Sequence, residues 1–509
     1  MRGDGARGVW LAAIWGGVCF ATAGCSSPAE AQGAGGSRGA SEDPRAALAT
    51  TSAPDRARIR IDGSFDDWPE GVAAIADGDY LYLRFSPGEE AGAAIQASSE
   101  QVVLHLDLDG RASTGRAVEG LGRSVELGAD LEVRFSPRVA GGRGSGVLVR
   151  AFDASGEATR ISHADADFMA SPTYASAWYE ARVSRHLDGV AALAGLEATG
   201  VARGVVAVYD ERNRLLGFSD PFEVSLPARS AEAPRADAPI PVKPAGALRV
   251  VNYNVERGAP MSNPGPFANK LSALDPDVVL VQEWTNSSEA DIRGWFNAML
   301  PDGAPWHVIR NETWGVAVVS RHPASSFLEG PVRRAGGATV RFVGARVETP
   351  AGSALVGSMH LKCCGGAGSS EDQTRIDEAA AIRDAVASAL EASGASLVVL
   401  GGDVNLVGTR TPLERLVEGL DDDGSDLAVA SAPVLGDASF YTWAEASSWF
   451  APGRLDWAVY NESGAELVHA FVLDTRRLSA RTLARHGLEE ADSSASDHVP
   501  VVIDLRARD

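Results

Sequence analysis

The carboxy-terminal half of the chain carries acids, histidines and carboxamides that each follow a short apolar run. The set comprises Asn254, Glu283, His360, Asp403, Asn405, Asp456, Asp497 and His498. Mg²⁺-like cations prefer carboxylate oxygens as ligands, and imidazoles hold or move protons near neutral pH. Hydrolysis of a phosphate ester needs both, because the reaction must neutralise phosphate charge, direct a water and protonate a leaving alkoxide. The inventory therefore predicts cation-assisted hydrolysis of a phosphate ester.

These side chains can cooperate only if the chain brings them to one place. Apolar, β-branched runs precede them and predict strands, and an alanine-rich segment with helical spacing predicts a helix at 371–392. The strands are expected at 248–255, 278–282, 316–320, 354–359, 397–400, 455–460 and 499–505. Strands interleaved with helices indicate an α/β architecture, in which the strand ends at one edge of the sheet usually form the ligand cleft.

The order of short motifs in this region resembles that of the endonuclease/exonuclease/phosphatase superfamily. The motifs are Gln282-Glu283, Gly315-Val316-Ala317 with Ser320-Arg321, His360-Leu361, Gly402-Asp403-Val404-Asn405, Arg454-Leu455-Asp456 and Ser496-Asp497-His498, with Asn254 preceding them. The superfamily includes deoxyribonuclease I, apurinic endonucleases, bacterial sphingomyelinases and inositol polyphosphate 5-phosphatases. The resemblance implies a four-layer α/β sandwich of the deoxyribonuclease I-like type and a phosphoesterase that depends on Mg²⁺ or Mn²⁺.

The resemblance also implies which residues form the metal site. Glu283 is expected to be the primary ligand of the ion, since it directly follows an apolar strand. Asn254 is expected to support that ligand and the phosphate as a neutral donor. Asp497 either supports these groups or binds a second ion.

The catalytic roles follow from the same resemblance. Asp403 and Asn405 are expected to orient the attacking water and hold the phosphoryl oxygens. His498 is the candidate general base or phosphate-stabilising imidazolium, and Asp456 fixes its tautomer. His360 is expected to stabilise or protonate the leaving group.

The substrate class stays open between nucleic acid, phospholipid, and inositol or sugar phosphates. The formal net charge is −22, and residues 247–509 carry 22 Lys+Arg against 35 Asp+Glu, which disfavours duplex DNA as a partner. Lys362 and Arg375 are the candidate substrate-binding cations. Arg321 and Arg454 are either structural or close to the phosphate.

Period-two alternation of apolar and polar residues across 56–227 predicts an antiparallel β-sandwich that is separate from the α/β region. The alternating segments are 57–63, 80–85, 101–110, 130–135, 146–153, 177–185 and 204–210. The Asp62-Gly63 and Asp67-Trp68 pairs near its start resemble those of carbohydrate-binding family 9 and DOMON-like sandwiches. That resemblance implies a glycan or cell-surface polymer as partner, so an alternative function is binding, with the hydrolase accessory to it.

Two pairs of residues in the predicted sandwich have alternative interpretations. Trp68 and Trp178 are either platforms for sugar rings or part of the core. Asp107 and Asp109 either cap a turn or ligate Ca²⁺, which takes carboxylate clusters in turns.

The amino terminus predicts an export signal over residues 1–25. Two arginines precede an uncharged apolar run at 9–23, which is too short to span a bilayer comfortably. Thr22-Ala23-Gly24-Cys25 resembles a bacterial lipoprotein signal, in which Cys25 would be lipidated; the alternative is an ordinary cleaved signal peptide. We therefore expect an exported protein of the bacterial cell envelope, lipid-anchored at the outer membrane or cell surface.

A length of 509 residues predicts two to four domains. Residues 26–55 are rich in Ala, Gly, Ser and Pro and predict a disordered tether, and residues 228–246 predict a Pro/Ala-rich linker. These segments separate a module at 56–227 from a catalytic domain at 247–509. The chain has four cysteines, which is no disulfide framework. Its adjacent pair, Cys363-Cys364, forms either a vicinal disulfide or two free thiols.

Overall fold

The computed structural model describes residues 59–88, 94–118, 126–138, 145–194, 200–301, 303–311, 315–350 and 352–508. The predicted export signal with Cys25 and the whole of the predicted tether at 26–55 lie outside the described residues. Within the described residues, no helix combines the length and apolar character that crossing a bilayer requires.

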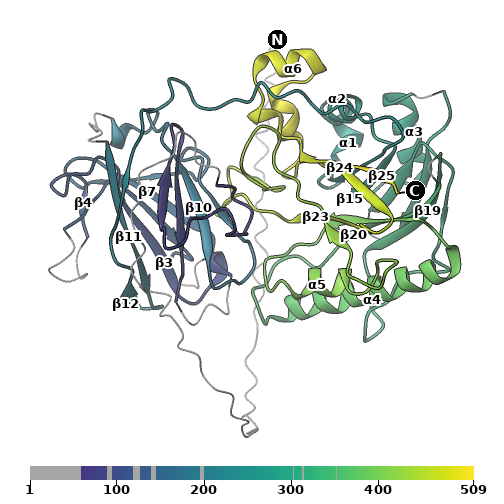
Figure 1. Ribbon diagram of the computed structural model, residues 1–509, viewed down its shortest axis with the longest axis horizontal. Helices are drawn as coiled ribbons and strands as arrows, with labels where there is room; N and C mark the ends of the chain where they lie inside the picture. Colours follow the sequence, from purple (N-terminus) through teal and green to yellow (C-terminus); the bar gives the residue numbers. More distant parts are fainter. Residues whose placement is uncertain are drawn as a thin grey trace, which may run out of the picture. The chain divides into compact units, whose positions relative to one another are not determined.

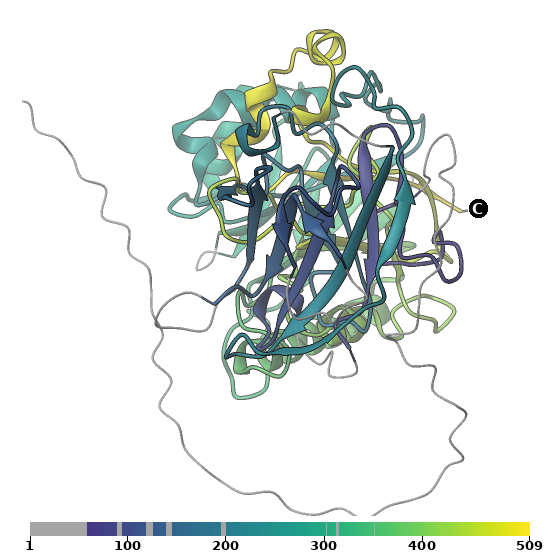
Figure 2. The ribbon, with the colours of Figure 1, turned by 90° about the vertical axis from the view of Figure 1, so that its left-hand side faces the viewer.

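The amino-terminal region consists of two antiparallel sheets. One sheet has the strand order β1-β2-β10-β9, and the other has the order β12-β11-β3-β6-β7-β8 with β13 also paired to β11. Figure 2 shows these strands running side by side. The strands are β1 (Ala74–Ala76), β2 (Tyr80–Phe85), β3 (Gln101–Asp107), β6 (Leu131–Phe135), β7 (Val147–Phe152), β8 (Ala158–Ile161), β9 (Met169–Ser171), β10 (Tyr179–Ser184), β11 (Val201–Tyr209), β12 (Leu215–Phe218) and β13 (Phe222–Ser225), with a separate pair β4 (Arg116–Ala117) and β5 (Gly128–Ala129). The predicted sandwich is confirmed.

Side chains at alternate positions of the strands point from one face of each sheet into a core that the two sheets share. On β2, Leu81, Leu83 and Phe85 face this core, and partner strands contribute further aliphatic and aromatic side chains. The alternating segment 57–63 was expected to add a strand, and this expectation is wrong for its described part. Ile61 instead makes a single parallel bridge to Ser439, in the carboxy-terminal half. Because Ser439 is distant from Ile61 in the sequence, the alternation of residues at 57–63 could not predict this pairing.

The carboxy-terminal region is built on two six-stranded sheets (Figure 1). The first has the order β16-β17-β15-β14-β25-β24 and the second the order β18-β19-β20-β21-β23-β22. The first comprises β14 (Leu248–Asn254), β15 (Val278–Gln282), β16 (His307–Asn311), β17 (Val316–Ser320), β24 (Ala465–Val472) and β25 (Val501–Ala507). The second comprises β18 (Ala324–Ser326), β19 (Phe342–Thr349), β20 (Gly352–His360), β21 (Leu397–Asp403), β22 (Ala428–Val429) and β23 (Asp456–Tyr460).

Helices cover the outer face of each sheet. In Figure 1, α1, α2 and α3 lie on one side of the paired sheets and α4 and α5 on the other. The predicted helix at 371–392 is observed as α4, capped at its start by the Ser369 hydroxyl and at its end by Gly394 in the left-handed conformation. The helices are α1 (Ala259–Ser262), α2 (Pro264–Leu274), α3 (Glu289–Met299), α4 (Ser370–Ser393), α5 (Thr411–Val417) and α6 (Ala480–His486).

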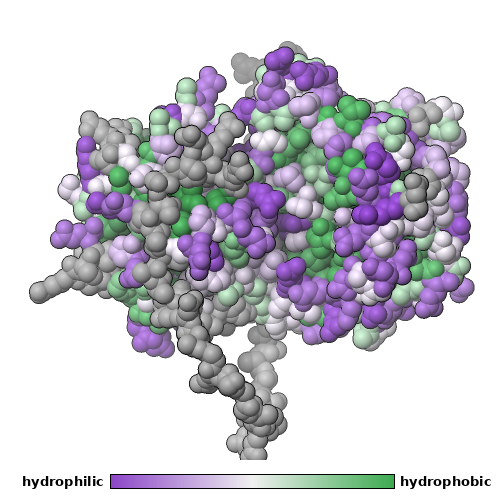
Figure 3. Space-filling view, in the orientation of Figure 1, coloured by the Kyte–Doolittle hydropathy of each residue, from purple (hydrophilic) through white to green (hydrophobic). Residues whose placement is uncertain are grey.

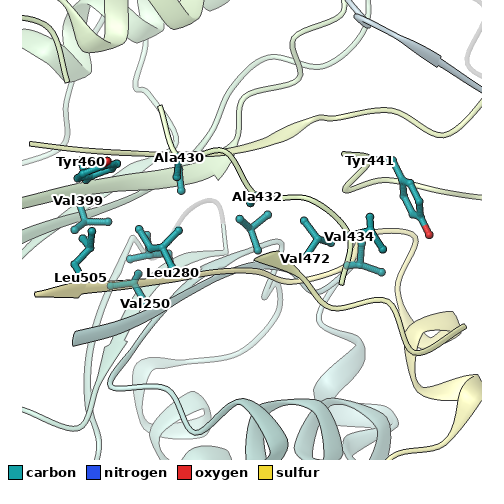
Figure 4. Close-up of a cluster of buried hydrophobic side chains, with 14 of the residues drawn as sticks. Val250, Leu280, Val399, Ala430, Ala432, Val434, Tyr441, Tyr460, Val472 and Leu505 are labelled. Atoms are coloured by element: carbon teal, nitrogen blue, oxygen red, sulfur yellow. The ribbon is translucent and has the colours of Figure 1, made fainter. Parts of the chain in front are cut away.

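Alternation along β15 shows why four layers form. Val278 and Leu280 pack in the core between the two sheets, whereas Val279 and Val281 pack against the helices on the outer face. Both faces of the strand are therefore buried, which explains its uninterrupted apolar sequence. Figure 4 shows Leu280 among the side chains that fill the space between the sheets. The predicted four-layer α/β sandwich is confirmed.

The Pro/Ala-rich segment 228–246 is bound to the carboxy-terminal domain. Ala236 pairs with Leu478 in a parallel bridge, and the Lys243 ammonium lies 2.8 Å from an Asp277 carboxylate oxygen. Ile240 is buried in the core beneath α2 and α3. On the face shown in Figure 3, hydrophilic residues are interspersed with smaller hydrophobic patches.

Candidate active site

Strand register brings the predicted catalytic residues of the second sheet into one row. On β20 and β21, His360 pairs with Asp403, and on β21 and β23, Asp403 pairs with Asp456. All three stand at the ends of their strands. Asn254 ends β14 opposite Gln282 of β15 in the first sheet, so Glu283 follows at the same edge. Both sheets therefore present their polar strand ends to a common site.

Glu283 lies at the more open part of this site. Its backbone has a φ of 61°, an uncommon conformation for a residue other than glycine, and its side chain is 28% exposed. Asn254 Nδ2 lies 3.4 Å from Glu283 Oε1, and the Arg257 backbone N–H donates to Oε2 at 3.1 Å. The carboxylate is thereby held in place while it keeps free lone pairs for a further ligand.

His498 and Asp456 form the tightest contact of the site. His498 Nδ1 lies 2.6 Å from Asp456 Oδ2, and both side chains are almost fully buried. The Asp456 backbone N–H donates to the Thr442 hydroxyl at 2.8 Å, which fixes the start of β23. With Nδ1 committed to Asp456, Nε2 is the imidazole atom that faces the rest of the site.

Asp403 lies at the centre of the cluster. Its Oδ2 accepts from Asn254 Nδ2 at 3.1 Å and lies 3.7 Å from His498 Nε2 and 3.5 Å from His360 Nε2. Its Oδ1 accepts the Asn405 backbone N–H at 3.1 Å. One carboxylate is therefore positioned by four neighbours that come from both sheets.

Burial and charge shift the pKa values of three of these groups in different directions. Burial raises the pKa of Asp403 to about 7, and the negative charge of Asp456 adds to this effect. Burial would lower the pKa of His498, but the carboxylates of Asp456 and Asp403 outweigh it and raise the value to about 10. Burial holds the pKa of His360 well below its ordinary value. Near neutral pH, His498 is therefore cationic and His360 is neutral.

The remaining predicted residues also lie at this edge. Asn405 has a φ of 51° and its Nδ2 donates to the Leu361 carbonyl at 3.3 Å. Asp497 is 28% exposed, its Oδ2 accepts from Trp443 Nε1 at 2.9 Å, and its Oδ1 lies 4.0 Å from His498 Nε2. The structure thus brings together all eight residues of the predicted metal and catalytic sets.

The two predicted substrate-binding cations differ. Arg375 is fully buried: its Nη1 donates to the carbonyls of Lys362 and Cys364, and its Nη2 donates to Asp372 at 3.0 Å. Its prediction as a substrate ligand is therefore wrong, because the loop after β20 already occupies these donors. Lys362 is partly exposed, and its backbone N–H donates to Glu378 at 2.8 Å.

Arg454 and Arg321 are both structural. The Arg454 guanidinium stacks 3.8 Å from the centre of the Trp457 ring and donates to a backbone carbonyl, and Arg321 pairs with Asp275 at 2.6 Å.

Cys363 and Cys364 are free thiols, with sulfur atoms 3.0 Å apart. Of the two alternatives left open by the sequence, the structure therefore has the reduced pair.

Several further residues support the site and were given no role from the sequence. Thr442 holds β23, Trp443 holds Asp497, and the Ser496 hydroxyl donates to the Asn254 carbonyl at 2.9 Å. Only Ser496 could have been found, because it belongs to the Ser-Asp-His motif. The others lie in a segment without a recognisable spacing.

The donor set fits a hard divalent cation. Glu283 and Asp497 are partly exposed carboxylates, Glu283 4.0 Å from His360 Nε2 and Asp497 4.0 Å from His498 Nε2, and both histidines contact the buried Asp403. Their oxygens suit Mg²⁺ or Mn²⁺, and a cation between them would offset the clustered negative charge. Asn254 Nδ2 supports these carboxylates, and its Oδ1 accepts the Glu256 backbone N–H at 3.1 Å while keeping a second lone pair that an ion could use.

Residues 251–498 match the model of the Endonuclease/Exonuclease/phosphatase family. The chain contains an endonuclease/exonuclease/phosphatase domain. The matched residues include both six-stranded sheets except for β25 and the first three residues of β14. No curated protein matches the chain in sequence.

Solved structures also resemble about half of this chain. Beta toxin 275-280 from Staphylococcus aureus is 17% identical, with a TM-score of 0.33, covering 50% of this chain and 99% of its own. TDP2 from D. rerio, complexed with a single-strand DNA product, is 15% identical, with a TM-score of 0.34, covering 51% and 99%. An AP endonuclease from Archaeoglobus fulgidus is 13% identical, with a TM-score of 0.33, covering 50% and 98%.

Proposed function

We propose that this protein is an exported, metal-dependent phosphoesterase that hydrolyses a phosphodiester or phosphomonoester by in-line attack of water. One observation carries the proposal: Glu283, Asp403 and the His498–Asp456 pair meet at the strand ends of an endonuclease/exonuclease/phosphatase domain. A carboxylate cluster beside a buried imidazolium provides the charges that phosphoryl transfer requires.

The side chains have complementary roles in this reaction. The His498 imidazolium, fixed by Asp456, donates its Nε2 proton as a hydrogen bond to a phosphoryl oxygen and stabilises its charge. Asp403 accepts a hydrogen bond from the attacking water and aims its oxygen at phosphorus. His360, being neutral, donates one N–H to the oxygen of the leaving group. Asn254 keeps the Asp403 carboxylate in position through its amide.

The proposed metal site consists of Glu283 and Asp497, with Mg²⁺ or Mn²⁺ as the ion. When bound, the ion supplies Lewis-acid stabilisation of phosphoryl charge. The partial exposure of these two carboxylates leaves them accessible to a substrate phosphate, which supports this proposal.

The decisive experiment measures hydrolysis by the purified full chain. Bis-p-nitrophenyl phosphate, DNA, RNA, sphingomyelin and inositol phosphates are offered with EDTA, Mg²⁺ or Mn²⁺. We expect hydrolysis of at least one substrate, loss of activity in EDTA and recovery with either ion. Activity that survives exhaustive chelation would exclude the proposed mechanism.

Two variants show whether this activity belongs to the proposed site. Glu283→Gln removes the expected metal ligand and should abolish activity at low Mg²⁺. His469→Ala is the matched control, because His469 pairs with Asp504 on β24 and β25, away from the site. Equal activity of both variants would mean that another site hydrolyses the substrate.

A second candidate function is glycan binding by the amino-terminal sandwich, with the resemblance to carbohydrate-binding family 9 as its starting point. Trp68 does not serve as a platform, because it is buried and its Nε1 donates to Glu180 at 3.0 Å. Trp178 is partly exposed, with the Arg84 guanidinium 4.8 Å from its ring centre.

A different surface of the sandwich favours this second function. A hollow of about 710 Å³ is lined by Tyr209, Arg134 and Asn213 among others. An aromatic ring beside charged and amide groups suits a hydroxyl-rich ligand. The test applies the full chain to polysaccharide columns. Retention that Tyr209→Ala abolishes would support glycan binding. Failure to bind any polysaccharide would leave hydrolysis as the only proposed function.

A further inference from the structure

Three aspartates meet at one edge of the amino-terminal sandwich. Asp107 ends β3, Asp109 lies two residues later, and Asp130 directly precedes β6. One carboxylate oxygen from each lies within 4.8 Å of the others. Antiparallel pairing of β3 and β6, with Leu106 opposite Leu131, brings the distant Asp130 to this place.

Two of these carboxylates are buried and incompletely bonded. Asp107 and Asp130 are each 0% and Asp109 1% exposed. Asp107 Oδ1 accepts the Arg111 N–H at 3.1 Å, and Asp130 Oδ2 accepts the Leu108 N–H at 2.8 Å. Among the residues that the structure describes, Asp107 Oδ2 and Asp130 Oδ1 have no hydrogen-bond partner and neither carboxylate forms an ion pair. Buried carboxylate oxygens in this state require a compensating ligand.

The turn that follows β3 closes over the unpartnered oxygens. Gly115 has a φ of 68°, and a Cβ at this position would lie 2.9 Å from Asp130 Oδ1. The Thr114 hydroxyl donates to Asp109 Oδ2 at 3.0 Å. Burial raises the pKa of Asp107 to about 6 and that of Asp130 to about 7, with the charge of Asp109 contributing to both. The pocket thus brings the unpartnered oxygens of Asp107 and Asp130 together beside the Asp109 carboxylate.

We propose that Asp107, Asp109 and Asp130 bind one Ca²⁺ ion. Ca²⁺ takes six to eight oxygens at about 2.3–2.6 Å, so two ligand oxygens on one ion lie at most about 5 Å apart. The observed limit of 4.8 Å falls within that range. Mg²⁺ demands near-ideal octahedral geometry at about 2.0–2.1 Å and usually keeps several waters, so it suits a site of three protein carboxylates less well.

The ion would tie the turn after β3 to the start of β6. The chain that leaves this turn lines the hollow that contains His105, Glu132 and Tyr209, and Arg116 stands on its wall. Ca²⁺ would therefore fix the positions of Arg116 and its neighbours in the wall of this hollow. This site is separate from the catalytic metal site, which lies in the other domain.

The test uses the full chain carrying Glu283→Gln, so that the catalytic ion site is weakened in every sample. After removal of metals with EGTA and dialysis, bound Ca²⁺ is counted by equilibrium dialysis with elemental analysis, and thermal unfolding is followed with Ca²⁺ or Mg²⁺. We expect one Ca²⁺ per chain and a Tm increase of about 5 °C or more for the sandwich transition at saturation. Mg²⁺ at the same concentration should give a smaller increase. No bound Ca²⁺, or equal shifts with both ions, would overturn the proposal.

Further substitutions locate the ion. Asp130→Asn in the same background should weaken Ca²⁺ binding at least about 10-fold, whereas Asp188→Asn should not change it, because Asp188 is 71% exposed and pairs with Arg229. Unchanged binding in Asp130→Asn would contradict the assignment. If Asp130→Asn does not fold, Asp109→Ser provides the same comparison. A metal-free chain that binds no Ca²⁺ and is stabilised by Asp130→Asn would show that shared protons, and not an ion, balance the cluster.

Discussion

Arg182 of strand β10 and Asp437 of the endonuclease/exonuclease/phosphatase domain form a buried, two-pronged ion pair. Arg182 Nη2 donates to Asp437 Oδ2 at 2.8 Å, Nη1 donates to the other oxygen, and Arg182 is 0% exposed. A second pair runs in the opposite direction, with Arg477 Nη1 of the catalytic domain 2.7 Å from Asp167 Oδ2 of the sandwich. The sandwich and the catalytic domain therefore share a charged interface that is fully buried at Arg182 and partly exposed at Arg477.

Removing Arg182 should destabilise the protein and slow catalysis. Arg182→Met leaves Asp437 buried without its main partner, and breaking a buried pair in this way costs about 3–5 kcal/mol. Asp437 lies five residues before Thr442, whose hydroxyl holds β23 and Asp456. We expect a loss in kcat of about 10- to 100-fold from misplacement of that strand. Urea unfolding and steady-state kinetics on the full chain measure both effects.

Arg203→Met is the matched control for this prediction. Arg203 also belongs to the sandwich and pairs with Glu223, but the two side chains are 41% and 52% exposed. Its loss should change stability by less than about 1 kcal/mol. Similar effects of the two substitutions would show that the interface pair is no more important than a surface pair.

His498 and Asp456 should behave as one catalytic unit. General acid–base and electrostatic roles of this kind are worth about 10²–10⁴-fold, so His498→Ala should lower kcat by that range or more. Asp456→Asn should lower kcat by a similar order with little change in KM, because the aspartate fixes the imidazole through a 2.6 Å contact. The double variant should be scarcely worse than His498→Ala alone.

A double-mutant cycle on folded proteins decides this question. Circular dichroism must first show native structure, since Asp456 is buried and its Oδ1 has no hydrogen-bond partner among the described residues. If the two losses multiply, the residues act independently and the pairing has no catalytic importance.

Lys270 should make stability depend on pH. Its Nζ donates to the Tyr253 hydroxyl at 2.6 Å beneath α2, and burial lowers its pKa from 10.5 to about 7. Between these two values the unfolded chain binds a proton that the folded chain does not. The contribution of Lys270 to the free energy of unfolding therefore rises with pH between these two pKa values. The Tm of the wild type should rise relative to Lys270→Met as pH increases from about 7 to about 10. A difference in Tm that stays constant would mean that the lysine keeps its ordinary pKa.

Membrane attachment should depend on Cys25. If this cysteine is lipidated, Cys25→Ser should move the protein from the membrane fraction to the soluble fraction, because lipid chains supply the anchoring energy. Fractionation of cells that express each form measures this directly. A wild-type protein that is already soluble would favour the ordinary cleaved signal peptide.

The sequence predicts the central strands of the catalytic domain well for a physical reason. Val278–Gln282 and Val316–Ser320 are observed with the predicted bounds, because both faces of these strands are buried and the apolar run has clear ends. The edge strand His307–Asn311 was not predicted, since it is only partly buried and carries polar residues.

Side-chain roles are harder to predict when they depend on the path of a loop. Arg375 is close in sequence to the site and cationic, yet its donors are occupied by carbonyls of a loop that folds back over α4. Asp130 was not grouped with Asp107 and Asp109, because only the pairing of β3 with β6 brings it to them. Both cases require contacts between segments that are distant along the chain.

The reciprocal pairs between sandwich and catalytic domain also constrain how such a chain can evolve. Recombination that joined this catalytic domain to a different sandwich would have to supply an arginine opposite Asp437 and an acid opposite Arg477 at the same time. A sandwich that lacked either residue would leave an unpaired charge at the interface between the two domains. The sandwich and the catalytic domain are therefore expected to be inherited together, with coupled substitutions at the paired positions, and not to be exchanged independently.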